Sequence, residues 1–235
     1  MCSRYSLTSP HEAVRAVFRT TRGHDYPPRY NIAPTQPVAI VRIGADHKRE
    51  LALVRWGLIP GWVKDPRTFT TLINARAETL LEKPSFRSAL RHRRCIVPAD
   101  AFYEWTGKPG AKQPHLIRPR SANTPMGLAG LWEHWLGADG SEMESMAIIT
   151  VAANDAIAAI HDRMPAILDP GDYDAWLDTR GVKDVLAADL LQPAPVDLLT
   201  TMKIGRSINN VRAEGPDLQR AIEAQADAPD GGKLL

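Results

Sequence analysis

Short runs of apolar and β-branched residues recur along the chain and are separated by segments rich in Gly and Pro. Runs of this length and composition are typical of β-strands. They predict strands over residues 38–43, 50–56, 94–97, 101–105, 115–118, 126–132 and 146–151. Seven or more short strands favour a β-rich α+β fold with a single domain, built as a curled mixed or antiparallel sheet or a barrel-like core with flanking helices.

Helical periodicity is confined to a few places. Ser9-Pro10-His11-Glu12 has the form of a capping box with Pro at the first helical position, and apolar residues follow it on one face. A helix is therefore predicted from about residue 9 to 21. Two shorter helices are predicted over 154–160 and 169–177, since each begins with an Asn or Asp suited to an N-cap.

Composition excludes several classes of protein. Of the 235 residues 44% are hydrophobic, yet no apolar run approaches the roughly 20 residues that span a bilayer. The N-terminus has no apolar signal-peptide core, so we expect a cytoplasmic protein without a membrane partner. The domain should cover residues 1–223, and the Ala-, Asp- and Gly-rich stretch 224–235 should be disordered.

The chain also lacks the usual signatures of cofactors and metals. Only two cysteines are present, without a CxxC pattern, and there is no GxGxxG, Walker-type lysine loop or HExxH motif. We therefore expect no metal site and no cofactor.

Charge is distributed unevenly. Residues 1–120 hold 21 Lys and Arg against 9 Asp and Glu, whereas residues 121–235 hold 8 against 18. A basic first half is compatible with a groove for nucleic-acid phosphates. Two complementary halves packed against each other would give the same pattern.

Cys2 is the most informative single residue. Methionine is normally removed when the second residue is small, which would leave Cys2 with a free α-amine and a free thiol on adjacent carbons. Their unperturbed pKa values are roughly 7.7–8.0 and about 8.5, so each keeps a minority reactive form near neutral pH. An aldehyde that meets this pair can form an imine and then close as a five-membered thiazolidine. The alternative is an incidental cysteine at a frayed terminus.

Three further side chains are candidates for acid-base or orienting roles. Glu104 lies between two aromatic residues, where desolvation would raise its pKa, although strand alternation can equally place it on the solvated face. His161 is either a proton donor or the cap of a helix C-terminus. Asn74 either orients a nucleophile or occupies a turn.

Arginines and tryptophans offer the contacts that DNA requires. The planar guanidinium groups of Arg4, Arg76 and Arg163 can each clamp a phosphate or form an ordinary ion pair. Trp62, in a Pro-Gly-Trp segment, offers a face for base stacking, whereas Trp56 within a predicted strand belongs to the core.

These segments together resemble the SRAP family, the SOS-response-associated proteins that shield abasic sites in single-stranded DNA. The resemblance extends from Cys2 to about Arg212. It rests on seven motifs in order: Met1-Cys2-Ser3-Arg4, Arg29-Tyr30-Asn31-Ile32-Ala33-Pro34-Thr35, Arg55-Trp56-Gly57-Leu58-Ile59-Pro60, Ile73-Asn74-Ala75-Arg76-Ala77-Glu78-Thr79, Arg94-Cys95-Ile96-Val97-Pro98-Ala99-Asp100, Phe102-Tyr103-Glu104-Trp105 and Ile160-His161-Asp162-Arg163-Met164-Pro165.

The resemblance implies a catalytic group of Cys2, Asn74, Glu104 and His161. His161 would assist opening of the deoxyribose ring, Glu104 would transfer protons, and Asn74 would hold Cys2 while its amine and thiol form a thiazolidine with C1′. The product is a covalent DNA–protein crosslink, and β-elimination from the imine implies weak lyase activity.

The same resemblance implies a DNA groove formed by Arg4, Arg76 and Arg163, with Pro34 and Trp62 contacting the bases. The expected partner is abasic single-stranded DNA, including single-strand to double-strand junctions, bound by a monomer. Two departures from the family pattern are Ser3, where glycine is usual, and Val63, where relatives tend to carry a second aromatic residue.

Two other functions remain open from sequence alone. A thiol N-terminal nucleophile can hydrolyse amide bonds, including that of its own leader, so a peptidase or autopeptidase is one alternative. A non-covalent single-stranded DNA-binding protein with an incidental cysteine is the other.

Overall fold

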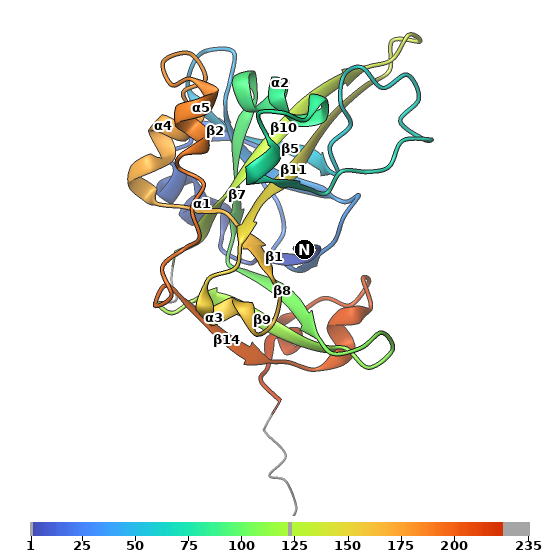
Figure 1. Ribbon diagram of the computed structural model, residues 1–235, viewed down its shortest axis with the longest axis vertical. Coiled ribbons are helices and arrows are strands. Elements are labelled where there is room, and N and C mark those ends of the chain that lie inside the picture. Colours follow the sequence, from blue (N-terminus) through green and yellow to red (C-terminus); the bar gives the residue numbers. More distant parts are fainter. Residues whose placement is uncertain (1, 122–123, 223–235) are drawn as a thin grey trace, which may run out of the picture.

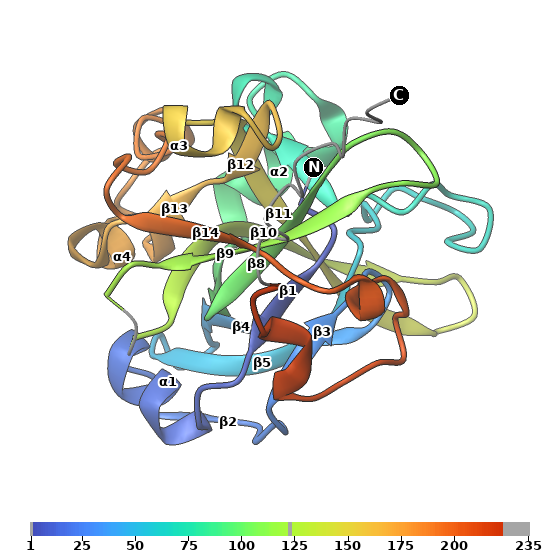
Figure 2. The same ribbon diagram turned by 90° about the horizontal axis from the view of Figure 1, so that it is seen from below.

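Two β-sheets form the framework of the protein, and short helices cover their edges (Figures 1 and 2). The computed structural model describes residues 2–121 and 124–222. The predicted disordered tail 224–235 and the removal of Met1 therefore concern residues outside the described part of the chain.

The smaller sheet has five antiparallel strands and carries the start of the chain on its fourth strand. In spatial order its strands are β14 (Leu199–Lys203), β9 (Gln113–Pro119), β8 (Ala101–Thr106), β1 (Tyr5–Leu7) and β3 (Arg29–Ile32).

The larger, nine-stranded sheet is mixed and curls back on itself. Its main order is β12 (Arg163–Pro165), β11 (Glu142–Ala152), β10 (Met126–Leu136), β7 (Arg94–Ala99), β4 (Pro37–Ile43), β5 (Arg49–Trp56) and β2 (Arg22–Gly23). β13 (Ile167–Leu168) pairs with β10, and β6 (Asn74–Arg76) pairs in parallel with β11. β5 also pairs with β11, which closes a ring of strands. The expected β-rich, barrel-like fold is confirmed.

The helices are short and lie at the periphery of the sheets. They are α1 (His11–Phe18), α2 (Pro84–His92), α3 (Asp155–Ala158), α4 (Tyr173–Leu177) and α5 (Asp184–Ala188), with 3₁₀ turns at Ala77–Thr79, Pro170–Asp172, Arg206–Asn209 and Pro216–Gln219. No helix within residues 2–121 and 124–222 is long and apolar enough to cross a membrane.

The predicted capping box of α1 is wrong. Pro10 occupies the N-cap position, and the helix ends at Phe18 because Arg19 adopts a left-handed conformation with φ of 53°. The Ser9 side chain does not cap the helix, since its Oγ donates to Asp100 Oδ1 at 2.7 Å while its N–H donates to Asp100 Oδ2 at 2.7 Å. By contrast, Asn154 caps α3 as predicted, because its Oδ1 accepts from the Ile157 N–H at 3.1 Å.

Apolar side chains from both sheets meet in a continuous core. Trp56 is fully buried, as predicted, and the Tyr5 ring packs edge-on against it with centroids 5.3 Å apart. A second cluster on the other face of the five-stranded sheet holds the C-terminal segment through Ile204, Ile208 and Leu218. The start of the chain is thus enclosed between the barrel and the last described segment.

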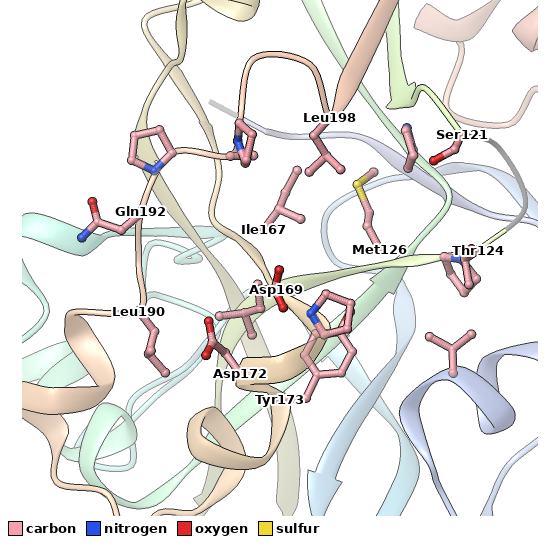
Figure 3. Close-up of a pocket in the computed structure, with 18 of the residues that line it drawn as sticks. Ser121, Thr124, Met126, Ile167, Asp169, Asp172, Tyr173, Leu190, Gln192 and Leu198 are labelled. Carbon is pink, nitrogen blue, oxygen red and sulfur yellow. The ribbon is translucent and has the colours of Figure 1, made fainter.

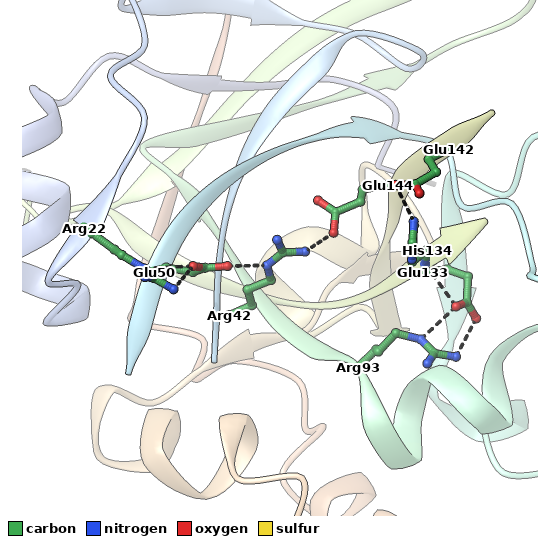
Figure 4. A network of polar contacts seen from close by, with 8 residues as sticks. All are labelled: Arg22, Arg42, Glu50, Arg93, Glu133, His134, Glu142 and Glu144. Atoms are coloured by element: carbon green, nitrogen blue, oxygen red, sulfur yellow. Dashed lines mark hydrogen bonds and ion pairs between the residues drawn. The ribbon is translucent and has the colours of Figure 1, made fainter. Parts of the chain in front are cut away.

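Ion pairs between the two halves of the sequence account for much of the charge asymmetry. Arg42 joins Glu50 at 2.8 Å to Glu144 at 2.6 Å, as Figure 4 shows. Among the described residues, five arginines of the first half pair with acids of the second: Arg29 with Glu214, Arg42 with Glu144, Arg49 with Asp174, Arg91 with Asp184, and Arg93 with Glu133. For these residues, the uneven distribution of charge reflects pairing between the two halves of the chain rather than a groove for nucleic acid.

Candidate active site

The site is centred on Cys2, which leads into β1 and is fully buried. Asn74 begins β6, where the backbone pairs with Ile148 of β11. The Asn74 Nδ2 donates a hydrogen bond to the Cys2 carbonyl oxygen at 2.8 Å. Because Cys2 precedes a strand of the small sheet and β6 belongs to the large one, this bond joins the two sheets at the start of the chain.

Asn74 is a strand residue, so the alternative that it occupies a turn is wrong. Local propensity favours Asn in turns, but the parallel pairing with β11 supplies the backbone partners of this segment. Its Oδ1 is buried and has no hydrogen-bond partner among the described residues. The Asn74 Nδ2 therefore holds Cys2, and the Asn74 Oδ1 can still accept a hydrogen bond inside the site.

The thiol of Cys2 is held in its protonated form. Burial raises the pKa of the Cys2 thiol, and the nearby Glu104 carboxylate raises it further. Sγ lies 3.8 Å from the Arg4 carbonyl oxygen, to which the thiol donates. A protonated, enclosed thiol is a poor nucleophile until a base accepts its proton.

Glu104 provides a buried carboxyl group whose pKa is raised above its usual range. It lies in β8 opposite His115 of β9 and is only 3% exposed, so the interpretation that it faces solvent is wrong. Burial raises the pKa of the Glu104 carboxyl, and an electrostatic interaction with the His161 ring acts in the opposite direction. The second effect requires Glu104 and His161 to lie close together, because electrostatic interactions weaken with distance.

His161 follows α3 and turns its ring toward the next strand rather than capping the helix. Its Nδ1 accepts from the Arg163 backbone N–H at 2.9 Å and lies 2.8 Å from Asp162 Oδ1. The contact with the Arg163 N–H requires Nδ1 to accept a hydrogen bond, whereas the contact with the Asp162 carboxylate requires it to donate one. The backbone N–H is fixed in direction, whereas the Asp162 side chain is 85% exposed. We therefore assign Nδ1 as the acceptor, which leaves the proton on Nε2.

The structure thus brings together four side chains that are far apart in the sequence. Asn74 contacts Cys2 directly, while Glu104 interacts electrostatically with both Cys2 and His161. They combine a thiol, a carboxyl with a raised pKa, an imidazole and an amide. Such a set can move protons at a reacting carbon and hold the nucleophile in place.

The three arginines predicted to bind DNA are in different environments. Arg76 is exposed, and no hydrogen bond or ion pair links its guanidinium to the described residues. Arg163 is largely engaged, since its Nη1 and Nη2 lie 2.5 and 2.9 Å from the two carboxylate oxygens of Glu78. Arg4 uses Nη1 to reach Asn31 Oδ1 at 2.6 Å. Arg76 is therefore the most available of the three for a phosphate.

The predicted base-contacting residues lie on exposed segments. Pro34 follows β3 in a tight turn and is half-buried. Trp62 is 59% exposed and its ring meets Phe69 edge-on, with centroids 5.6 Å apart. Val63 is 8% exposed and belongs to a small core cluster instead. Phe69, which sequence reasoning missed, supplies the second aromatic ring of this loop.

Asn31 is another residue whose role the sequence did not reveal. It is fully buried, and besides accepting from Arg4 it donates through Nδ2 to the carbonyl oxygens of Asn210 and Ala213, both at 2.9 Å. Nδ2 also lies 3.4 Å from the Ile208 carbonyl oxygen. This amide connects the C-terminal segment to the residue two positions after Cys2. Its only sequence signal was membership in the 29–35 motif.

No group of His, Cys, Asp or Glu side chains suited to a metal ion occurs within residues 2–121 and 124–222.

Comparison with known proteins identifies the family. The family model described as SOS response associated peptidase (SRAP) matches residues 1–211. The chain belongs to the SRAP family. The resemblance deduced from the motifs is thereby confirmed over nearly the whole described chain.

Relatives of this SRAP protein share one kind of name. It is 38% identical over 223 residues to the abasic site processing protein YoqW of Bacillus subtilis. The aligned region covers 93% of this chain and 98% of that protein. It is 34% identical over 229 residues to the abasic site processing protein HMCES of Gallus gallus, covering 84% of this chain and 67% of that protein. A solved structure from Bacteroides thetaiotaomicron has a TM-score of 0.81 at 28% identity and covers 94% of the SRAP chain and 100% of its own.

Proposed function

We propose that this protein processes abasic sites in single-stranded DNA by forming a covalent crosslink through Cys2 after removal of Met1. The relatives named as abasic site processing proteins support the substrate. The observation that carries the chemistry is the contact of Asn74 with the Cys2 carbonyl beside Glu104 and His161.

The first steps convert the sugar and the amine to an imine. His161 donates a hydrogen bond from Nε2 to the ring oxygen O4′ as the C1′–O4′ bond breaks. Glu104 in its protonated form gives its proton to O4′ and takes the proton of the C1′ hydroxyl, which leaves the aldehyde and returns Glu104 to its protonated form. The Cys2 amine attacks C1′ and forms a carbinolamine. Glu104 in its protonated form then donates to the departing hydroxyl, so that one water leaves and an imine remains. A carboxyl whose pKa is raised by burial suits this donation.

Ring closure uses the thiol. The imine is protonated, because its nitrogen keeps one hydrogen of the amine when water leaves. Glu104, now ionised, accepts the Sγ proton as sulfur attacks the imine carbon, and the C=N electron pair moves to the nitrogen, which becomes a neutral amine. The new C–S bond completes a thiazolidine, and the overall reaction releases one water. The thiol pKa raised by burial keeps sulfur unreactive until the imine has formed, so the amine reacts first.

Asn74 has a double role in this proposal. Its Nδ2 fixes the Cys2 carbonyl, and its buried Oδ1 is an acceptor for the α-amine that removal of Met1 would create. Holding both groups of one residue limits the conformations of the terminus and so favours attack at C1′. Ser3 in place of glycine narrows that freedom further.

The DNA would lie along the exposed basic and aromatic residues near the site. Arg76 is free to contact phosphate, and Trp62 with Phe69 offers stacking surfaces for unpaired bases. Arg163 would have to share its guanidinium between Glu78 and a phosphate. We propose that the protein acts as a monomer on single strands and at junctions.

The test uses oligonucleotides with one abasic site, beside unmodified ones, and denaturing gels with intact-mass analysis. Wild type should give an adduct only on the abasic strand, with a mass that corresponds to loss of Met1 and one water. Cys2→Ala should give no stable adduct, although borohydride should trap its imine because the amine remains. Cys95→Ala is the matched control, since the other buried cysteine has no part in the reaction.

Two outcomes would overturn the proposal. Salt-sensitive binding to DNA without any adduct would favour a non-covalent single-stranded DNA-binding protein. Hydrolysis of a peptide substrate that depends on Cys2, again without an adduct, would favour a peptidase, because amide hydrolysis needs the thiol and an oxyanion site but no aldehyde.

A further inference from the structure

A second concave site lies away from Cys2, between α1, α4 and the approach to β14. It is a cavity of about 660 Å³, within the range of ligand-binding pockets in proteins. Figure 3 shows Met126, Ile167 and Leu198 converging on it from different segments, with Asp169 and Asp172 beside them. None of the residues assigned above to the crosslinking reaction lines it.

The wall of the cavity is apolar and well supported. Leu168 and Tyr173 are 2% and 4% exposed, and five of the lining residues are prolines, which restrict the backbone of the rim. The wall segment around Ala194 is also fixed, because Asn154 Nδ2 donates to the Ala194 carbonyl oxygen at 2.8 Å. A cavity with such a wall is preformed and binds without large rearrangement.

The charged side chains that line the cavity all have one sign. Asp169, Asp172 and Asp189 line it, and no Lys or Arg does so among the described residues. Asp169 Oδ1 accepts from the Gly171 N–H at 2.8 Å, which fixes its carboxylate at the rim. A negative rim repels phosphates and attracts cations, so this surface is not a continuation of the DNA path.

Exposed apolar side chains extend the site beyond the cavity. Leu198 lines it and is 36% exposed, and Val196, two residues earlier, is 51% exposed. An apolar surface that continues out of a cavity suits an elongated ligand better than a small enclosed one. We propose that this cavity docks a short peptide segment of a partner protein, in which one or two large apolar side chains stand next to Lys or Arg.

In this arrangement the apolar side chain enters between Ile167, Leu168 and Tyr173, and the cation faces the three aspartates. Apolar burial supplies the affinity, whereas the carboxylates select basic over acidic segments. The segment would attach the protein to another component while leaving the surface near Cys2 open to DNA.

The test is selection of phage-displayed random dodecapeptides on the full-length protein, followed by fluorescence anisotropy with a selected synthetic peptide. We expect enriched sequences with Leu, Ile, Met or Phe beside Lys or Arg. Asp172→Asn combined with Asp189→Asn should weaken binding of the peptide at least tenfold, and Leu198→Ser about fivefold. Glu82→Gln, which removes one negative charge from an exposed residue outside the cavity, should leave it within twofold.

Three results would overturn the proposal: no enrichment, enrichment of acidic peptides, or equal binding to wild type and the cavity variants when thermal unfolding shows that all are folded. Hydrogen exchange locates the peptide directly, and protection should appear in β13 and residues 189–198. Displacement of the peptide by an unmodified single-stranded oligonucleotide would also refute it. Because the readout is peptide binding, failure here would not affect the crosslinking proposal, and failure of crosslinking would not affect this one.

Discussion

Replacement of Asn74 tests whether its amide positions the nucleophile. In Asn74→Ala the 2.8 Å hydrogen bond to the Cys2 carbonyl is lost, and that carbonyl belongs to a fully buried residue. An orphaned buried acceptor costs about 1–3 kcal/mol. Since 1.36 kcal/mol corresponds to a tenfold change in rate, crosslinking should slow by roughly 5- to 150-fold.

Asn74→Asp should be more damaging than Asn74→Ala, although it conserves the size of the side chain. A carboxylate cannot donate to the Cys2 carbonyl and repels it instead. It also stabilises the protonated form of the neighbouring amine, which is not nucleophilic. We expect a loss of at least about 100-fold, because the lost hydrogen bond and the less reactive amine act together.

The assay is single-turnover crosslinking to an abasic oligonucleotide, quantified on denaturing gels. Affinity for an unmodified oligonucleotide, measured by anisotropy, should stay within about twofold for Asn74→Ala, because its side chain faces Cys2 and not a phosphate. Gln192→Ala, an exposed amide on another face, serves as the control. Wild-type crosslinking by Asn74→Ala would refute the positioning role, and a parallel loss of DNA affinity and thermal stability would assign the residue to structure alone.

Three further predictions concern other parts of the site. Glu104→Gln should abolish most crosslinking, yet iodoacetamide should alkylate the Cys2 thiol faster than in wild type. Burial still raises the pKa of the thiol in this variant, but the carboxylate that raises it further is gone, so slower alkylation would contradict the prediction. Burial raises the pKa of Glu104 in the folded protein above its value in the unfolded chain. The contribution of Glu104 to the free energy of unfolding is therefore full at pH values below the unfolded-state pKa and is lost as the pH rises through the folded-state pKa. The Tm of Glu104→Gln should accordingly exceed that of wild type at pH 8 but not at pH 4. Arg76→Ala should reduce the slope of the logarithm of the single-strand binding constant against the logarithm of the salt concentration by about 0.7. Arg163→Ala should chiefly lower the Tm, because it breaks the ion pair with Glu78. The reverse pattern would show that Arg163 binds the phosphate.

Much of the larger sheet is predictable from sequence because its strands are long and apolar. Residues 38–43, 94–97 and 146–151 are rich in β-branched and other apolar residues, and each segment lies within an observed strand. The short helix after Asn154 was also predictable, since a local side-chain bond defines its start. Such features depend on neighbours in sequence, which a single chain reveals.

The missed elements depend on partners far along the chain. Strands β1 and β6 have three residues each, and they exist because β8 and β11 supply hydrogen bonds from distant positions. The helix α2 was also not predicted, although its signal is local. Pro84 lies in its first turn, and the buried Phe86, Ala89 and Leu90 are spaced as in a helix. The predicted capping box does not form because Asp100, which is distant in sequence, accepts the hydrogen bond of the Ser9 hydroxyl.

The grouping of the four candidate catalytic residues is the part that sequence alone could not supply. Asn74 and His161 belong to segments joined by the Glu78–Arg163 ion pair, since Glu78 follows β6 and Arg163 begins β12. Cys2 and Glu104 belong to the other sheet, where the Asn31 amide holds the C-terminal segment against β1. The site therefore forms only where the two sheets meet. Its geometry depends on the Glu78–Arg163 ion pair and on the Asn31 amide, so conservative changes at Glu78 or Asn31 should alter crosslinking through the position of the catalytic groups rather than their chemistry.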